Sequence, residues 1–248
     1  MQLSYTAIVL KKRDTGETDR MYSLLTLESG KVRAIARGVR KPVAKLAGQL
    51  ETINLASLSI MRNRGRGNIA GALAEEFFPN VRRNETSLRA ALEAVSAVDA
   101  RVEEDEVDSE LFALLLNFLR SLEIVSVLPR ENADEEARFL EKVFLLSQGF
   151  FWKFLSRLGY SVEVRLCAAG REALLPGERY FFSPDLGGIV CSRHCEMAEI
   201  ALPFGENAVK FLRILFANAL PSLPKLFIDR ETTLLLRRAL KSFLDWTG

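Results

Sequence analysis

Apolar and polar positions alternate over short stretches in the first 80 residues, which predicts β-strands. The expected strands span residues 6–10, 21–27, 32–37, 49–60 and 68–73. The turn at 28–31 joins the second strand to the third, and the glycine-rich stretch 62–67 predicts a loop before the last. Five short strands favour a small closed barrel such as the OB-fold, because closure leaves no exposed sheet edge. An SH3-like barrel would show nearly the same pattern.

From residue 84 onward the pattern is helical. Helices are expected over residues 86–98, 110–127 and 134–158, and apolar residues spaced i, i+3, i+4, i+7 predict two more over 208–219 and 236–243. Segment 110–127 is apolar on nearly all sides, so we expect it at the centre of a second domain. Gly149 falls inside the third helix, where glycine costs about 1 kcal/mol relative to alanine.

The fold class is therefore α+β, with a barrel domain over residues 1–80 and a helical domain over 81–248. Within the second domain, residues 160–203 form an insert that is rich in glycine and proline and contains all three cysteines. Three cysteines cannot make a disulfide scaffold and fit a reducing compartment. The N-terminus does not resemble a signal peptide, and the apolar run 111–128 is interrupted by polar residues. We expect a soluble, cytoplasmic protein without a membrane partner.

Charge is distributed unevenly between the two predicted domains. Residues 1–80 carry a net charge of +6 and residues 81–248 carry −4, which suggests domains with different partners. The single histidine, His194, leaves little scope for histidine-based catalysis. The acidic residues between 103 and 110 are expected to form a solvated loop.

The positive charge gathers on one predicted strand and the segments that follow it. Strand alternation puts Lys31, Arg33 and Arg37 on one face and the small apolar residues between them on the other. Further basic residues follow at Arg40, Lys41, Arg62, Arg64 and Arg66. Such a surface suits sequence-independent binding to nucleic-acid phosphates, although a solvated barrel exterior is equally compatible with the composition. Few aromatic residues precede Phe77, so stacking should be minor and salt dependence large.

These same segments resemble a known family. The runs YTAIVL at residues 5–10, GETDR at 16–20, LTLESGK at 25–31 and ARGVRKP at 36–42 are similar to the N-terminal region of bacterial RecO. The helices and the cysteine insert follow in the family's order.

The resemblance implies an N-terminal OB-fold and a helical C-terminal domain that carries a degenerate zinc-ribbon-like insert. It also implies a non-enzymatic DNA repair and recombination mediator, which binds single- and double-stranded DNA in the bacterial nucleoid and anneals complementary strands. In the RecF pathway the family assists loading of RecA together with RecR and the single-stranded-DNA-binding protein, and needs no nucleotide. The family's basic barrel surface maps to Arg33, Arg37, Arg40 and Lys41. Two alternatives are an adaptor between RecR and the single-stranded-DNA-binding protein, with little DNA binding of its own, and a small nuclease.

Many RecO proteins carry two C-x-x-C pairs that form a closed zinc site. Here Gly170 replaces the second thiolate of the first pair, and the second pair reads CSRHC over residues 191–195. Four residues of ligand type are present: Cys167, Cys191, His194 and Cys195. They are compatible with zinc, although three ligands within five residues are crowded. A ribbon held by packing alone and a catalytic cysteine–histidine pair are the alternatives.

Basic residues also flank the apolar stripe of the last predicted helix, at Arg237, Arg238 and Lys241. An apolar groove with a cationic rim could hold a short acidic peptide. The single-stranded-DNA-binding protein ends in such a tail, which the family binds through its helical domain. A solvated helix face is the alternative.

Overall fold

The structure is a computed structural model that describes residues 2–41, 44, 46–61 and 67–248. Internal contacts group the chain into two units, Met1–Val143 and Phe144–Gly248, and each is described on its own. The change from strands to helices falls near residue 80, whereas the change of unit falls within helix α5 (Ala133–Arg157).

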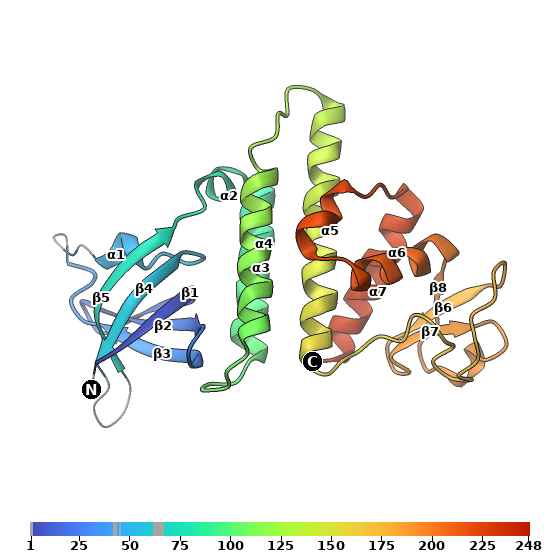
Figure 1. Ribbon diagram of the computed structural model, residues 1–248, viewed down its shortest axis with the longest axis horizontal. Coiled ribbons are helices and arrows are strands. Elements are labelled where there is room, and N and C mark those ends of the chain that lie inside the picture. The colour runs from blue at the N-terminus through green and yellow to red at the C-terminus, as the bar shows by residue number, and fades with distance from the viewer. Residues whose placement is uncertain (1, 42–43, 45, 62–66) are drawn as a thin grey trace. The chain divides into compact units, whose positions relative to one another are not determined.

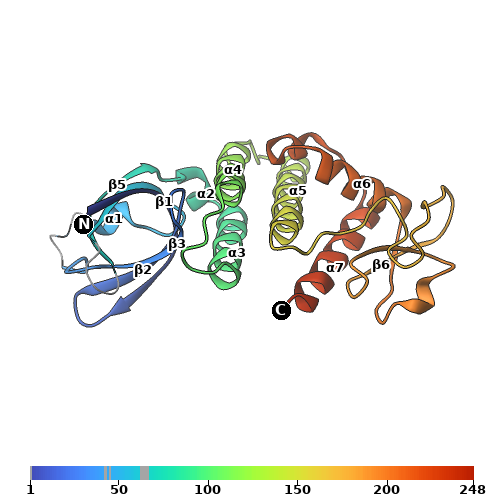
Figure 2. The same ribbon diagram turned by 60° about the horizontal axis from the view of Figure 1, so that its bottom comes forward.

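The first unit begins with a closed five-stranded barrel (Figures 1 and 2). Its strands are β1 (Gln2–Thr15), β2 (Asp19–Thr26), β3 (Gly30–Ala36), β4 (Leu55–Met61) and β5 (Gly67–Glu76). They follow the order β1-β2-β3-β5-β4, in which β3 and β5 pair in parallel and the other neighbours are antiparallel. This arrangement confirms the predicted OB-type barrel.

Alternation along the strands fills the barrel with small and branched side chains. Val32, Ala34 and Ala36 of β3 point into the core, where they join residues such as Val9 and Tyr22. Gly30, the first residue of β3, has a positive φ of 65°, a conformation that glycine adopts at little cost.

The fourth strand starts later than predicted. Residues 49–54 do not belong to β4, because Leu46–Gln49 form the short helix α1 and Ile53 has a φ of 72°. The buried Asn54 fixes this turn by donating from Nδ2 to the carbonyls of Gly48 and Gln49, at 3.3 and 3.1 Å. A polar anchor inside an otherwise apolar run interrupts the extended backbone.

Three helices complete most of the first unit: α2 (Pro79–Arg83), α3 (Glu85–Arg101) and α4 (Ser109–Val125). Asn84 caps α3 by accepting from the Ser87 amide, and Asp108 caps α4 by accepting from the Leu111 amide, both at 2.9 Å. Helix α4 packs with α2 and α3 in this unit, and Leu115 and Leu119 are fully buried, so its apolar sequence reflects burial within Met1–Val143.

The second unit contains the end of α5, α6 (Glu206–Ala217), the 3₁₀ segment η2 (Leu220–Lys225) and α7 (Arg230–Trp246). Trp152 of α5 is fully buried and stacks on Phe243 of α7 with 5.6 Å between ring centroids. A Cβ at Gly149 would lie 2.2 Å from Cδ1 of Leu223. The glycine that weakens α5 therefore allows η2 to approach it closely.

The insert is a small three-stranded sheet in the order β7-β6-β8, built from β6 (Tyr180–Ser183), β7 (Gly188–Cys191) and β8 (Leu202–Phe204). A 3₁₀ turn, η1 (Cys195–Met197), follows β7. Phe182 attaches the sheet to the helices, with its ring 5.5 Å from that of Trp152 and 5.8 Å from that of Phe243. Across the described residues, every helix is too short or too polar to traverse a bilayer.

Candidate nucleic-acid interface and metal centre

The outer face of the barrel carries a row of aligned residues across three strands. Lys11 of β1 lies opposite Ser23 of β2, and Ser23 lies opposite Arg33 of β3. These residues, together with Arg13, Met21 and Asp99, line a shallow hollow. Arg33 is ion-paired with Glu104 at 3.0 Å, and Lys11 lies 3.7 Å from a carboxylate oxygen of Asp99. Lys11 and Arg13 were not predicted as site residues, although both point outward by strand alternation.

Lys31 does not belong to this exposed surface. It points away from the barrel core, as predicted, but it is only 5% exposed and its Nζ donates to the backbone carbonyl of Asp99 at 2.9 Å. The end of α3 therefore covers it. The Lys31 ammonium group is therefore a structural contact and not part of the exposed basic surface, contrary to the prediction.

The acidic segment that follows α3 lies directly against the start of β3. The Asp105 amide donates to the Lys31 carbonyl at 3.0 Å, and a Cβ at Gly30 would lie 1.9 Å from the Glu106 carbonyl oxygen. The side chains of residues 103–106 remain exposed, as predicted. Their backbone is nevertheless docked, so the segment is part of the barrel surface rather than a separate loop.

A second basic group lies on the turn after β3. Arg37, Arg40 and Lys41 are all exposed. Two aspartates hold this turn against the β1–β2 hairpin: Asp19 accepts from the Gly38 amide at 2.8 Å, and Asp14 pairs with Arg40 at 3.3 Å.

Both aspartates are stabilised in their charged form. The Gly38 amide chiefly lowers the pKa of Asp19. The side chain of Arg20, whose Nε lies 2.7 Å from Asp14, chiefly lowers the pKa of that carboxyl. The loop residues Arg62, Arg64 and Arg66 lie outside the described part of the chain.

The three basic residues of α7 are not equivalent. Arg238 and Lys241 line a hollow together with Ile200, Leu202 and Trp246. Arg237 instead lies over the ring of Phe144, with 5.5 Å between its guanidinium carbon and the ring centroid. The hollow combines apolar side chains with these two cations and with Asp245, whose carboxylate lies 3.9 Å from Nζ of Lys241.

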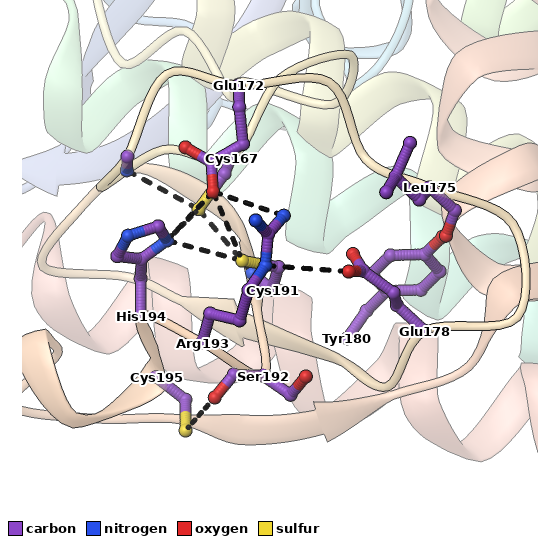
Figure 3. Close-up of polar contacts among 11 residues, drawn as sticks. Cys167, Glu172, Leu175, Glu178, Tyr180, Cys191, Ser192, Arg193, His194 and Cys195 are labelled. Atoms are coloured by element: carbon purple, nitrogen blue, oxygen red, sulfur yellow. Dashed lines mark hydrogen bonds and ion pairs between the residues drawn. The ribbon is translucent and has the colours of Figure 1, made fainter.

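In the insert, three of the four predicted metal ligands converge (Figure 3). The Sγ atoms of Cys167 and Cys191 and the Nδ1 atom of His194 lie within 4.8 Å of one another. The His194 nitrogen is 3.7 Å from the Cys167 sulfur and 3.3 Å from the Cys191 sulfur. Two soft sulfurs and an imidazole nitrogen are a donor set that zinc accepts, so the residues fit the metal that the cysteine pattern implied.

The backbone around Cys167 favours its thiolate. Burial opposes ionisation, but amide groups of Cys191 and Gly170, each 3.5 Å from the sulfur, outweigh it and hold the pKa of Cys167 below its ordinary value. Burial chiefly raises the pKa of Cys191. A metal-binding thiol must lose its proton, and the amides facilitate this step at Cys167.

Cys195, the fourth predicted ligand, does not join the group. It begins the turn η1, where its Sγ lies 3.3 Å from the Ser192 carbonyl oxygen and points away from the other sulfurs (Figure 3). Adjacent side chains such as His194 and Cys195 leave the backbone in different directions, and only one of them faces the cluster. Glu172 reaches it instead, although nothing in the sequence marked this glutamate.

Comparison with known proteins matches both parts of the chain. The family model described as recombination protein O N terminal covers residues 1–78, and the model for recombination protein O C terminal covers residues 86–247. The chain belongs to the RecO family. Relatives described as DNA repair protein RecO include one from Dehalococcoides mccartyi strain 195, which is 30% identical and aligns over 95% of this chain and 87% of its own length. One from Pelotomaculum thermopropionicum is 28% identical over 97% of this chain and 87% of its own length.

The chain is thus a RecO-family DNA repair protein with an OB-type barrel. The C-x-x-C pattern that the resemblance implied is interrupted at Gly170 and His194, and these two positions lie side by side: a Cβ at Gly170 would be 2.4 Å from Cε1 of His194.

Proposed function

We propose that the protein is a non-enzymatic recombination mediator, which binds single- and double-stranded DNA and anneals complementary strands. In the RecF pathway it would assist RecA loading together with RecR, in the bacterial nucleoid. The observation that carries the proposal is the basic outer surface of the barrel, with Lys11, Arg13 and Arg33 on the strands and the exposed turn at 37–41.

This surface suits a protein that holds strands by their phosphates. Each cation that neutralises a phosphate releases counterions, which gives affinity without reading sequence. The strand face presents no row of aromatic rings to stack bases, so base edges remain available for pairing. Complementarity between strands then supplies the specificity of annealing, and no covalent chemistry is required.

A double charge reversal tests the proposal. Arg33→Glu combined with Arg37→Glu should slow annealing of complementary oligonucleotides at least about tenfold, since two phosphate contacts become repulsive. Lys210→Glu with Lys225→Glu is the matched control, because these exposed cations lie in the second unit and carry the same charge change. Equal annealing by both variants would contradict the placement on the barrel.

The hollow on α7 supports binding of an acidic, apolar peptide of the kind that ends the single-stranded-DNA-binding protein. Arg238 and Lys241 would meet its carboxylates, and Ile200, Leu202 and Trp246 its apolar side chains. Arg238→Glu should weaken binding of a fluorescent tail peptide at least about tenfold. Arg237→Glu is the control, because its guanidinium lies over Phe144.

These two experiments also separate the mediator from a pure adaptor. The adaptor alternative predicts that Arg33→Glu with Arg37→Glu leaves DNA binding unchanged while Arg238→Glu abolishes peptide binding. The protein would then link its partners without binding DNA itself. Loss of annealing in the barrel variant, with intact peptide binding, is the result that we expect.

We further propose that the insert holds a structural zinc ion through Cys167, Cys191 and His194. Zinc would cross-link the segment around Cys167 to the end of β7, in a region with only three short strands. Zinc content of the untagged full-length protein, measured by elemental mass spectrometry, should be close to one ion per chain.

A further inference from the structure

A carboxylate oxygen lies beside two of the three cluster ligands. Oε1 of Glu172 is 3.1 Å from Nδ1 of His194 and 3.8 Å from Sγ of Cys191 (Figure 3). Carboxylate oxygen is an accepted zinc ligand alongside sulfur and nitrogen. Glu172 therefore adds a donor atom of suitable type next to His194 and Cys191.

The separations between Nδ1 of His194 and the two sulfurs match the edges of a tetrahedron, and the separation from Oε1 of Glu172 is slightly shorter. With zinc–sulfur bonds of about 2.3 Å and zinc–nitrogen or zinc–oxygen bonds of about 2.0–2.2 Å, tetrahedral ligand atoms lie roughly 3.3–3.8 Å apart. The Nδ1 atom of His194 is 3.7 and 3.3 Å from the two sulfurs and 3.1 Å from Oε1 of Glu172. One imidazole nitrogen carries either one proton or one lone pair, so it can form only one strong hydrogen bond. Two sulfurs and a carboxylate oxygen around the same nitrogen are therefore better explained by a shared metal ion than by three hydrogen bonds.

The loop that carries Cys167 turns back to present Glu172. The Arg171 amide donates to the Cys167 carbonyl and the Cys167 amide donates to the Glu172 carbonyl, both at 2.8 Å. Arg171 has a φ of 63°, which closes the turn. Arg193 contacts the carboxylate, with Nη2 3.2 Å from Oε1 of Glu172. The backbone turn and this ion pair together position the Glu172 side chain.

Gly170 makes this arrangement sterically possible. A Cβ at this position would lie 2.2 Å from Oε2 of Glu172 and 2.4 Å from Cε1 of His194. A cysteine here would therefore collide with both donors. Glycine at position 170 therefore leaves the space that the side chains of Glu172 and His194 occupy.

We propose that Glu172 is the fourth ligand of a closed Cys₂HisGlu zinc site, in the position that the sequence had suggested for Cys195. The proposal rests on the structural zinc proposed above and is independent of DNA binding. Arg193 acts as a positioning residue, because its guanidinium contacts the Glu172 carboxylate.

Metal binding to the full-length protein tests the ligand set. Zn²⁺ affinity is measured by competition with a chromophoric chelator, and Co²⁺ is added as a spectroscopic probe of coordination. Glu172→Gln should lower Zn²⁺ affinity at least about tenfold. Glu178→Gln is the matched control, since Glu178 carries the same charge and also pairs with Arg193, at 3.5 Å. Cys195→Ser should bind Zn²⁺ like the unaltered protein.

A ligand exchange gives a positive signal that a folding defect would not mimic. Glu172→Cys should retain metal and raise the thiolate-to-Co²⁺ charge-transfer absorption by about half, because three sulfurs would then bind in place of two. Unchanged affinity in Glu172→Gln, or loss of affinity in Cys195→Ser, would overturn the assignment of Glu172. Absence of metal from the unaltered protein would instead overturn the zinc proposal itself, and neither result bears on annealing.

Discussion

Lys31 and Asp99, 68 positions apart in the sequence, are joined by a hydrogen bond of 2.9 Å from the lysine Nζ to the aspartate backbone carbonyl. The bond ties β3 to the end of α3. A residue that would otherwise be an exposed cation on the barrel thereby becomes a structural contact.

Replacing this lysine should affect stability rather than DNA binding. Lys31→Met keeps the apolar stem but loses the charged hydrogen bond, which is worth about 1–3 kcal/mol of unfolding free energy. We expect such a loss in urea denaturation, with oligonucleotide affinity within about twofold of the unaltered protein. A large loss of affinity with unchanged stability would return Lys31 to the DNA-binding surface.

The acidic segment after α3 should weaken DNA binding at Arg33. Glu104 pairs with Arg33 at 3.0 Å, and both side chains are partly exposed, so the pair is worth less than about 1 kcal/mol. Glu104→Gln should therefore tighten oligonucleotide binding by about two- to fivefold at low salt. Glu103→Gln, with the same change of charge, should have a smaller effect, and equal effects would indicate long-range electrostatics alone.

Gly149 should tolerate no side chain while Leu223 stays in place. A Cβ at Gly149 would overlap Leu223, which is fully buried, so Gly149→Ala should destabilise the protein by about 1–2 kcal/mol despite the better helix propensity of alanine. In the Leu223→Ala background the same substitution should be neutral or stabilising. A double-mutant cycle in thermal denaturation measures this coupling, and simple additivity would contradict it.

Asp19 should contribute to acid sensitivity. Because the Gly38 amide lowers the pKa of Asp19 below 3.8 in the folded protein, the carboxylate stabilises the fold above that pH, and this stabilisation is lost as the pH falls through the lower, folded value. Asp19→Asn should therefore lose less stability between pH 5 and pH 2 than the unaltered protein. Asp134→Asn, at the exposed start of α5, controls for the change in charge. Parallel pH profiles for Asp19→Asn and the unaltered protein would contradict this role.

Local periodicity predicted much of the fold, because it reflects contacts along one element. Alternation correctly assigned Val32 and Ala34 to the core and Arg33 to the surface. It could not show that Lys31 is covered, since the covering carbonyl belongs to Asp99 on a distant helix. The start of β4 was missed for a similar reason, because Asn54 fixes its turn through side-chain hydrogen bonds.

The metal-ligand cluster in the insert was likewise predictable from the sequence only in part. The spacing of Cys167, Cys191 and His194 identified three converging residues. Sequence could not choose between Cys195 and Glu172, because the choice depends on the directions in which their side chains leave the backbone and on the space left by Gly170.

The salt dependence of oligonucleotide binding tests the central claim most directly. If barrel cations neutralise phosphates, the logarithm of the binding constant should fall linearly with the logarithm of salt concentration, with a slope of about −0.7 per contact on single strands. Arg37→Ala combined with Lys41→Ala should make that slope shallower by about 1.4. A slope near zero, or an identical slope in the variant, would contradict binding through the charges of the barrel.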